Sequence, residues 1–512
     1  MRLLQQFGRV AAPLFLWASL AAGLTLRPQQ PAPAASEASQ SYRSAMEQAD
    51  QKIWEAEQKH SEVVENEEYL TTFIGPRLTG SPAMNQASQW TLGLFRKYGL
   101  QAHLETATIP RAWFRGNDWG EITHPLQHWM TVHSVAWGRP TPGPVEGFLA
   151  LLDPKANAET IRQNAATYRG AIVLQDEPQR PAELPENPPN AYNAVIPLPR
   201  GIQSQPSEAE LRQRRAQYVE RIKALAEAGA LALLLDSGKP YSLEVTGGFY
   251  PPYEPTPLPI AYVSHSDYLW LVRLARHGGA SFRLQLAGRF SDGPATASIT
   301  VAEIPGTDLA DQRVIIGGHL DSWDLGQGAV DNGTGAMATL EAARLLASLG
   351  WKPRRTLTFV LFTGEEQGGV GVRTFLQNHA AELDRVDAVL VDDTGAGRIT
   401  SISLENLWET APLMEQVYLP LQEVFDLQPL STQYFGASDH VPFLRAGVPA
   451  YFCVQEPAQY GLAHHSQYDV FEVVDPQALR QQAAVLAAWM WNVSQLPEAF
   501  PHHHRQPEPA HP

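Results

Sequence analysis

The chain has 512 residues, which is more than one hydrophobic core usually holds, so its length predicts at least two domains. Its apolar content of 44% is that of a globular protein, and its formal net charge of -16 argues against nucleic acid or an anionic membrane as a partner. The single cysteine, Cys453, excludes an internal disulfide and a multi-cysteine zinc site. Any metal ion therefore has to be held by histidines and carboxylates.

The N-terminus has the order of features that is typical of a secretory signal peptide. Arg2 and Arg9 precede an apolar run from Val10 to Leu26, and a stretch rich in Pro, Ala, Gln and Ser follows it. We expect residues 1–40 to be a signal peptide and linker, the protein to be secreted or periplasmic, and no stable membrane insertion to remain after signal removal. The alternative is an uncleaved anchor, because a run of about 17 apolar residues is at the lower limit for spanning a bilayer.

Residues 41–125 read as the N-terminal part of a larger domain. The stretch 41–59 is charged and rich in alanine, which predicts a solvent-facing helix. Residues 65–98 predict two helical segments separated by a Gly-Pro-Arg turn and a Thr-Gly-Ser turn. No residue in this part looks catalytic by itself.

Residues 126–292 differ in sequence pattern from the residues before them. They contain short strand-like runs, long Pro-rich loops and few catalytic candidates. The runs are GFLALL, GAIVLQ, ALALLLD, LPIAYVS and SFRLQLAG. Helices are predicted near 209–228 and 265–277, and a Pro-dense loop at 178–206 has no function that its sequence indicates. This pattern predicts a small α/β or β-rich module inserted into the larger domain.

Residues 293–498 alternate apolar strands with helices. Strands are predicted at VIIGGH, TLTFVLFTG, VDAVLVDD and VPAYFCV, and helices at 334–349, GVRTFLQNHA, 413–424 and 476–491. The alternation predicts an α/β domain with a mostly parallel sheet covered on both faces. The tail at 499–512 is of low complexity and is expected to be disordered.

Acidic and imidazole side chains recur where the predicted strands of this domain end, which is where open α/β sheets place their sites. The candidates are His319, Asp331, Glu366, one of Asp392 and Asp393, and one of His464 and His465. Two divalent ions about 3.5–4 Å apart need a bridging carboxylate plus further carboxylates and imidazoles, and this set satisfies that need. Asp331, in the Gly-rich GAVDNGTG, is the natural bridge, and Asp321 is placed to accept the second ring N–H of His319.

The adjacent Glu365 and Glu366 follow a buried apolar strand, with no Lys or Arg close in sequence. Two buried carboxylates side by side repel each other and lose hydration, so each of them needs a cation. Neighbouring residues point in different directions, so one can bind metal while the other accepts a proton from a metal-bound water. The pair therefore favours a metal-dependent hydrolase.

Six motifs occur in an order and spacing that resemble those of a known family. They are GGHLDSW, AVDNGTG, FTGEEQG, VDDTG, ASDHVPF and HHSQYD. Together they look like the co-catalytic zinc exopeptidases of the aminopeptidase and carboxypeptidase Q type. IGPRLTGS resembles the segment before that family's insertion, and YRGAIVLQ with ALAEAGALALLL resembles a protease-associated domain.

The resemblance implies a three-layer, phosphorylase/hydrolase-like α/β sandwich, an inserted protease-associated domain and two zinc ions per chain. It implies one zinc on His319 and Asp393, with Asp392 as the rival of Asp393, and the other on Glu366 and His465. Asp331 would bridge the two zinc ions. Glu365 takes the general-base role toward a metal-bridged water, and His464 stabilises the oxyanion.

The leading hypothesis is thus a zinc metallopeptidase that removes terminal residues from short peptides, as an aminopeptidase, a dipeptidase or a carboxypeptidase. The runner-up enzyme is a single-zinc glutaminyl cyclase on the same fold. A third reading, from another class, is a non-catalytic binding or receptor protein. Nucleic acid is not expected as a partner, and a homodimer stays open.

Overall fold

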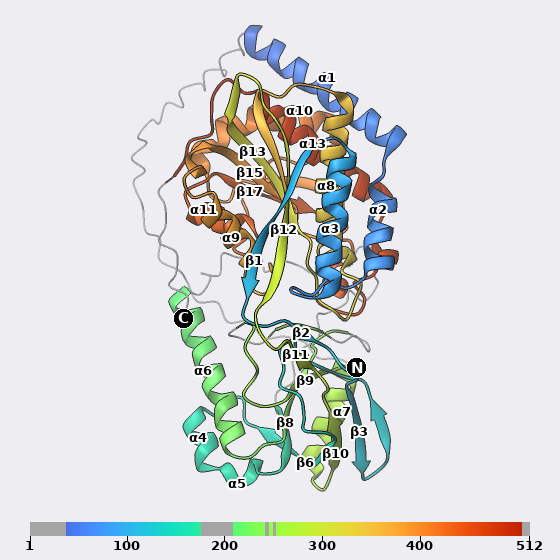
Figure 1. Ribbon diagram of the computed structural model, residues 1–512. Coiled ribbons are helices and arrows are strands. Elements are labelled where there is room, and N and C mark those ends of the chain that lie inside the picture. Colours follow the sequence, from blue (N-terminus) through green and yellow to red (C-terminus); the bar gives the residue numbers. More distant parts are fainter. Residues whose placement is uncertain (1–36, 176–207, 241–244, 249–251, 504–512) are drawn as a thin grey trace, which may run out of the picture. The chain divides into compact units, whose positions relative to one another are not determined.

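The computed structural model describes residues 37–175, 208–240, 245–248 and 252–503 (Figure 1). The expected signal peptide up to residue 36, the Pro-dense loop and the end of the tail lie outside the described residues. By its internal contacts the chain divides into a unit of residues 1–41 and a unit of residues 42–512, and the account below concerns the second unit. Within the described part, no helix combines the length and apolar character needed to cross a membrane.

A seven-stranded sheet forms the framework of the larger body. Its strands, in spatial order, are β1 (Gln101–Ile109), β12 (Ala295–Ile304), β14 (Arg355–Phe362), β13 (Leu309–His319), β15 (Val386–Val391), β17 (Ala450–Gln455) and β16 (Ile399–Ser403). The central strands β14, β13, β15 and β17 are parallel, whereas β1, β12 and β16 join the sheet by antiparallel pairing. The prediction of a mostly parallel sheet is therefore wrong, because half of the strand pairs are antiparallel.

The antiparallel strands β1 and β12 were not among the predicted elements. They pair over their full lengths, from Gln101 opposite Glu303 to Ile109 opposite Ala295. The two strands form a long ribbon, and the segment of chain that connects β1 to β12 contains the whole second sheet (Figure 1). Pairing between segments so distant in sequence leaves no local pattern from which it can be recognised.

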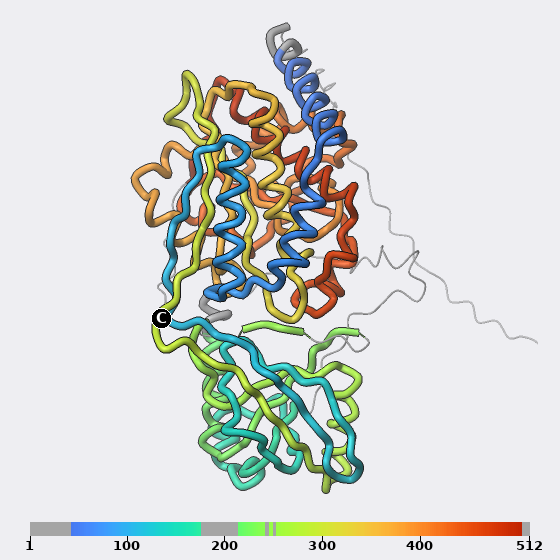
Figure 2. The backbone as a smooth tube through the Cα atoms, turned by 45° about the vertical axis from the view of Figure 1, so that its right-hand side comes forward, coloured from blue at the N-terminus to red at the C-terminus, as the bar shows by residue number. Residues whose placement is uncertain are grey.

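An eight-stranded mixed sheet forms between β1 and β12 in the chain. Its strands, in spatial order, are β4 (His128–Met130), β3 (Trp119–His124), β10 (Ser281–Gln285), β6 (Val145–Leu152), β7 (Ala171–Gln175), β8 (Ala232–Asp236), β9 (Ile260–Val263) and β5 (Val132–Ser134). A two-stranded ribbon accompanies it, made of β2 (Trp113–Phe114) and β11 (Arg289–Phe290). Its helices are α4 (Ala158–Gln163), α5 (Ala165–Tyr168), α6 (Glu208–Glu227) and α7 (His265–His277). Their apolar residues form two clusters, one with Ile122, Ile172 and Phe282 and the other with Ile161 and Ile222. Figure 2 shows the backbone of these strands and helices, coloured from teal to yellow-green.

Helices pack against the seven-stranded sheet because their apolar faces match buried strands. The helices are α1 (Glu37–His60), α2 (Val63–Tyr69), α3 (Pro82–Lys97), α8 (Thr334–Leu349), α9 (Val370–Asn378), α10 (Ala411–Phe425), α11 (His440–Arg445), α12 (Tyr460–Ala463) and α13 (Pro476–Gln495). Short helical turns are η1 (Leu70–Ile74), η3 (Ala329–Gly333), η4 (Leu383–Arg385), η5 (Trp408–Thr410) and η6 (Phe471–Val473). Helices α8 and α13 are rich in buried alanines, contact each other and contact β13 and β14. Helices α9 and α11 contact each other, α9 also contacts β1 and β12, and α11 contacts β15 and β17.

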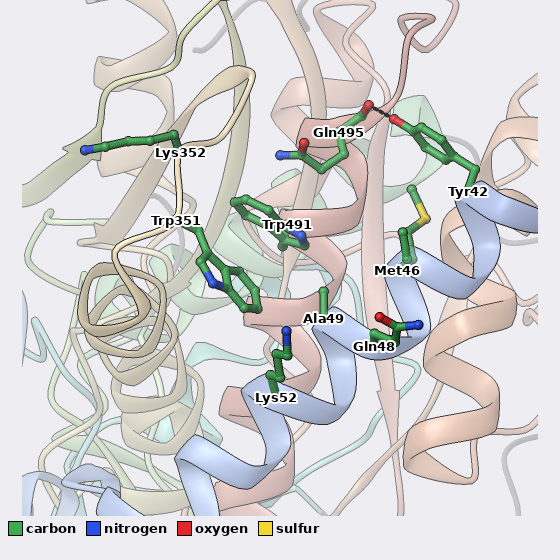
Figure 3. A pocket seen from close by; sticks show the side chains of 10 residues that line it. Tyr42, Met46, Gln48, Ala49, Lys52, Trp351, Lys352, Trp491 and Gln495 are labelled. Carbon is green, nitrogen blue, oxygen red and sulfur yellow. Dashed lines mark hydrogen bonds between the residues drawn. The ribbon is translucent and has the colours of Figure 1, made fainter.

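A cavity of about 440 Å³ lies between α1, α13 and the turn that follows α8. Trp351 and Trp491 lie in it with ring centroids 4.8 Å apart, and Lys52 points toward them (Figure 3). None of the candidate metal ligands lines this cavity. The candidate site therefore has to be located from its side chains rather than from this hollow.

Candidate metal centre

The candidate ligands come from segments that follow the four central parallel strands. His319 is the last residue of β13, Glu366 follows β14, Asp393 follows β15, and His465 follows β17. The carboxyl ends of parallel strands meet at one edge of a sheet, so side chains far apart in the sequence are brought together there. Each of these strands is an apolar run that is buried along most of its length, which fixes the edge at which it ends.

One group of potential ligands is formed by His319, Asp331 and Asp393. Nε2 of His319 lies 3.2 Å from Oδ1 of Asp331 and 3.2 Å from Oδ1 of Asp393. The His319 side chain is 1% exposed. One nitrogen and two oxygens thus converge in a site that is closed to bulk water, which is a donor set suited to zinc.

A second group contains the two adjacent histidines. Nε2 of His465 lies 2.9 Å from Oε2 of Glu366 and 3.4 Å from Oδ2 of Asp331. Nε2 of His464 lies 3.8 Å from the same oxygen of Asp331, and the two imidazole rings stack with centroids 3.7 Å apart. Of the two histidines, only His465 is in contact with Glu366 among the contacts of the described residues.

Asp331 belongs to both groups and presents a different oxygen to each. It lies in η3, where its backbone leaves the helical conformation at φ -128° and ψ 91° and its peptide bond to Asn332 is cis. The amide of Asn332 donates to the carbonyl oxygen of Asp392 at 2.8 Å and accepts from the backbone of Gly335 at 3.1 Å. The loop is thereby fastened to the end of β15 and to the start of α8.

Two buried groups that the sequence did not single out fasten the same loop from its other side. Arg77 is fully buried and donates to the carbonyl oxygens of Leu320 at 2.7 Å and Gly328 at 2.6 Å. Oδ1 of Asp469 accepts from the backbone N–H of Val330 at 2.6 Å. Asp469 ends the motif HHSQYD, and Arg77 lies in IGPRLTGS, so both belong to motifs of the sequence although neither was a candidate site residue.

Asp321 does not take the contact that was expected for it. Nδ1 of His319 lies 2.9 Å from the backbone carbonyl oxygen of Asp321, whereas the nearest oxygen of its carboxylate is 3.6 Å away. The carbonyl is therefore the acceptor that orients the imidazole ring. The buried carboxylate accepts instead from Oγ1 of Thr79 at 3.1 Å and from the backbone N–H of Glu365 at 3.3 Å. The carboxylate of Asp321 thus connects the ends of β13 and β14 and does not accept the ring N–H of His319.

The two aspartates after β15 point to different neighbours. Asp393 contacts His319, as described above. Oδ1 of Asp392 accepts from the amide of Gln455 on β17 at 2.6 Å, and its backbone carbonyl oxygen accepts from Asn332. Asp393 is accordingly the aspartate that the fold brings into the ligand group.

The electrostatics of this edge disfavour charged carboxylates unless positive charge is added. Burial raises the pKa of Glu365 to about 8, and the nearby carboxylates of Asp393, Asp321 and Asp331 act in the same direction. Burial also raises the pKa of Glu366 well above its usual value, with Asp331 adding to the effect. Burial alone would raise the pKa of Asp331 too, but His319 and the adjacent histidines hold it below its usual range.

Several buried oxygens at this edge lack a protein partner. Within the described part of the chain, Oε1 of Glu366 and both carboxylate oxygens of Asp439 accept no hydrogen bond. Asp439 lies within electrostatic reach of Glu365 and His319, and burial raises its pKa well above the usual value. A buried carboxyl group without a donor either keeps a proton or is paired with a cation or a metal ion, and here imidazole nitrogens converge on the same place. The residues at this edge therefore fit a metal centre, and zinc suits their mixture of imidazoles and carboxylates.

Loops of the second sheet also reach this edge. Nζ of Lys239 donates to the carbonyl oxygens of Gly461 at 2.9 Å and His464 at 2.7 Å. The backbone N–H of Thr246 donates to the carbonyl oxygen of His465 at 2.7 Å, and His465 itself has a positive φ of 55°. Burial lowers the pKa of Lys239 to about 8, and Asp331 opposes that shift.

Comparison with known proteins places the chain in a family. Residues 300–490 match the model of peptidase family M28. Carboxypeptidase Q from Homo sapiens is 31% identical over 437 residues, which cover 84% of this chain and 85% of that protein. Carboxypeptidase Q from Rattus norvegicus is 29% identical over 442 residues, with the same shares covered.

Solved structures share the fold. A peptidase M28 precursor from Shewanella amazonensis superposes with a TM-score of 0.73 at 24% identity, covering 90% of this chain and 100% of that one. A zinc aminopeptidase from Bacillus subtilis superposes with a TM-score of 0.60 at 18% identity, covering 84% and 93%. With the donor set at the sheet edge, these findings establish that the chain belongs to peptidase family M28 and is a zinc metallopeptidase.

Proposed function

We propose that this protein is an exported, two-zinc exopeptidase that hydrolyses terminal peptide bonds of short peptides. The observation that carries the proposal is Asp331, which offers one oxygen to His319 and the other to His465. A carboxylate shared by two ligand groups is the arrangement that a pair of metal ions requires. A single-metal site has no use for the second group.

The proposed ligands divide into two sets around Asp331. His319 and Asp393 would hold one zinc, and Glu366 and His465 would hold the other. When bound, the zinc ions supply Lewis acidity and lower the pKa of a bound water toward neutrality. The protein's own groups then have to position the substrate and move one proton.

Glu365 is proposed to move that proton. Its neighbour Glu366 is committed to His465, while Glu365 has its backbone fixed to the Asp321 carboxylate and its side chain among the site carboxylates. It accepts the proton of the attacking water as the new C–O bond forms, and it returns a proton to the amine when the C–N bond breaks. A carboxylate whose affinity for protons is increased by burial is well matched to both transfers.

His464 is proposed to donate a ring N–H to the carbonyl oxygen of the scissile bond. Its side chain is 39% exposed, against 28% for His465, so it faces the open side of the stacked pair. Burial lowers its pKa, so the ring is neutral at physiological pH and still carries one N–H. A hydrogen bond that strengthens as the oxygen gains charge lowers the barrier of the reaction.

The remaining parts of the chain are assigned by the same proposal. We propose that residues 1–40 direct export, that residues 41–125 and 293–498 form a three-layer peptidase domain, and that residues 126–292 form an inserted protease-associated domain. The second sheet between β1 and β12 supports an inserted domain, although one of its strands, β3 (Trp119–His124), lies entirely ahead of residue 126. Nucleic acid and membranes are not proposed as partners, and a homodimer is allowed.

A substrate panel and a metal assay test the proposal together. Zinc-loaded protein is incubated with free dipeptides and with peptides blocked at one or both ends, and released amino acids are quantified. We expect products only from peptides with a free end, and about two zinc ions per active chain by elemental analysis. Cleavage within doubly blocked peptides would exclude an exopeptidase. One zinc per fully active chain would exclude the two-metal arrangement and favour the cyclase alternative.

A further inference from the structure

Lys239 is a cation from the second sheet that lies at the edge of the zinc site. It follows β8, yet its ammonium group reaches the carbonyl oxygens of Gly461 and His464, at 2.9 and 2.7 Å. The same turn is held by the backbone N–H of Thr246, which donates to His465 at 2.7 Å. The inserted sheet therefore contributes a charged side chain directly beside the adjacent histidines.

The charge of Lys239 is not cancelled by its partners. An ammonium group has three N–H donors, and two of them are used on neutral carbonyl oxygens. Among the described residues, no carboxylate lies within salt-bridge distance of its Nζ. One donor and the positive charge therefore remain for another acceptor, and the side chain is only partly buried.

Other cations near the site are already committed. Arg77 is fully buried, and its guanidinium donates to the backbone carbonyl oxygens of Leu320, Gly328 and neighbouring residues. Arg115 forms a double hydrogen bond with Asp324, at 2.8 Å for both contacts. Within the described part of the site, Lys239 is thus the cation that can still bind an anionic group.

The surroundings give this cation a specific use. In the proposed enzyme, the carboxylates of Asp331, Glu366 and Asp393 would be balanced by the metal ions that they hold. A peptide's carboxylate loses hydration when it enters this partly buried edge, so an ammonium group without a carboxylate partner is a favourable place for it to bind. In a dipeptide, that carboxylate lies one residue beyond the scissile carbonyl, a span of at most about 3.6 Å. Lys239 is hydrogen-bonded to the backbone carbonyl oxygen of His464, the residue whose ring is proposed to contact the scissile carbonyl.

We infer that Lys239 binds the free α-carboxylate of the substrate, so that the enzyme removes the last residue and dipeptides are its smallest substrates. The inference rests on the proposed function, because it takes the scissile carbonyl to lie at His464. It makes the inserted sheet a determinant of substrate choice. A charge-assisted hydrogen bond to a carboxylate is among the stronger contacts that a lysine makes.

The test compares Leu-Gly with Leu-Gly-amide, which differ in the charge at the C-terminus. The wild-type protein, Lys239→Met, Lys239→Arg and a control, Lys155→Met, are assayed with zinc loaded and with zinc content measured. Lys155 is exposed and lies in the same inserted part of the chain. We expect wild type to prefer Leu-Gly, and Lys239→Met to raise the KM for Leu-Gly by about tenfold or more. The kcat/KM for Leu-Gly-amide should change by less than about twofold, since no ion pair is lost.

Each other outcome has a definite meaning. Equal losses on both substrates, or a fall in zinc content, would show that Lys239 only holds the histidine turn, and the inference would be overturned. Wild-type protein that cleaves the amide as well as the acid would also overturn it, while leaving the exopeptidase proposal intact. Absence of hydrolysis of every peptide would overturn the proposed function itself. Lys239→Arg should keep part of the preference for the free acid, because the charge is retained.

Discussion

Two regions of this molecule bury carboxylates, and they differ in how the charge is compensated. At the edge of the seven-stranded sheet, buried carboxylates surround imidazoles and share Asp331. Beneath α1, Asp50 and Glu57 are also fully buried, but no histidine approaches them among the contacts of the described residues. Burial raises the pKa of both Asp50 and Glu57 to about 8, with Glu341 adding to the shift of Glu57.

The comparison shows that burial alone does not identify a metal site. Under α1, a proton on each carboxyl group removes the charge, and Asp50 then needs only the amide of Asn492, 3.1 Å away. At the sheet edge, imidazole nitrogens converge on the same oxygens, and they offer a metal ion the mixed ligands that it prefers. The type and convergence of the donors, rather than the degree of burial, separates the two regions.

The strongest test of this difference replaces one glutamate in each region by an uncharged glutamine. Glu365→Gln should lower kcat by about 10²–10⁴-fold, because it removes the proton acceptor, while the zinc content stays at the wild-type level. Glu57→Gln serves as the matched control and should leave kcat unchanged, since its carboxyl group is already protonated at neutral pH. Steady-state kinetics measures kcat, and elemental analysis measures the zinc content. If Glu365→Gln retained wild-type kcat, Glu365 would not be the base.

The two adjacent histidines at the edge of the seven-stranded sheet should differ in their roles. His465→Ala removes the contacts to Glu366 and Asp331 and should weaken zinc binding by more than about 100-fold. Mutating a residue that only supports a metal ligand typically costs up to about 100-fold in affinity, and losing a ligand itself should cost more. His464→Ala should retain zinc and lower kcat, because His464 has the longer contact to Asp331. Zinc competition with a chelator of known affinity measures the first effect and turnover the second. The reverse pattern would exchange the two roles.

The smallest expected effect concerns stability in the region under α1. The pKa of Asp50 is about 8 in the folded protein and near 3.8 when unfolded. The folded state therefore keeps a proton that the unfolded state releases, so this contribution is full below about pH 4 and declines as pH rises to about 8. Asp50→Asn, which cannot ionise, should therefore lose less stability than wild type as the pH rises from about 4 to about 8, and the two proteins should differ least near pH 4.

Denaturant unfolding at several pH values, with zinc in excess for both proteins, measures that difference. Because zinc binding is the same in both proteins, its own pH dependence cancels. A pH-independent difference between Asp50→Asn and wild type would show that Asp50 is ionised in the folded state, and the contrast between the two regions would then be wrong.

Much of the fold was predictable from local patterns, and part of it was not. The helix over 334–349 and the apolar strand ending in His319 were predicted because their sequence periodicity is strong. The strands β1 and β12 were missed, and with them the antiparallel half of the sheet, because their pairing joins residues separated by the whole second sheet. The types of ligand were recognised because each follows a buried strand. The contact of Asp321 was mistaken because a backbone carbonyl competes with the carboxylate of the same residue.

The sequence by itself determined which chemical groups this protein has and at which strand ends they lie. It contained the imidazoles and carboxylates of a zinc peptidase, together with a single cysteine. Only the tertiary structure decided that Asp393 rather than Asp392 joins His319, that His465 rather than His464 meets Glu366, and that Lys239 reaches the site. The physical reason is that side-chain direction at a strand end depends on loops held by distant residues, such as Arg77 and Asp469, whose contacts no local pattern encodes.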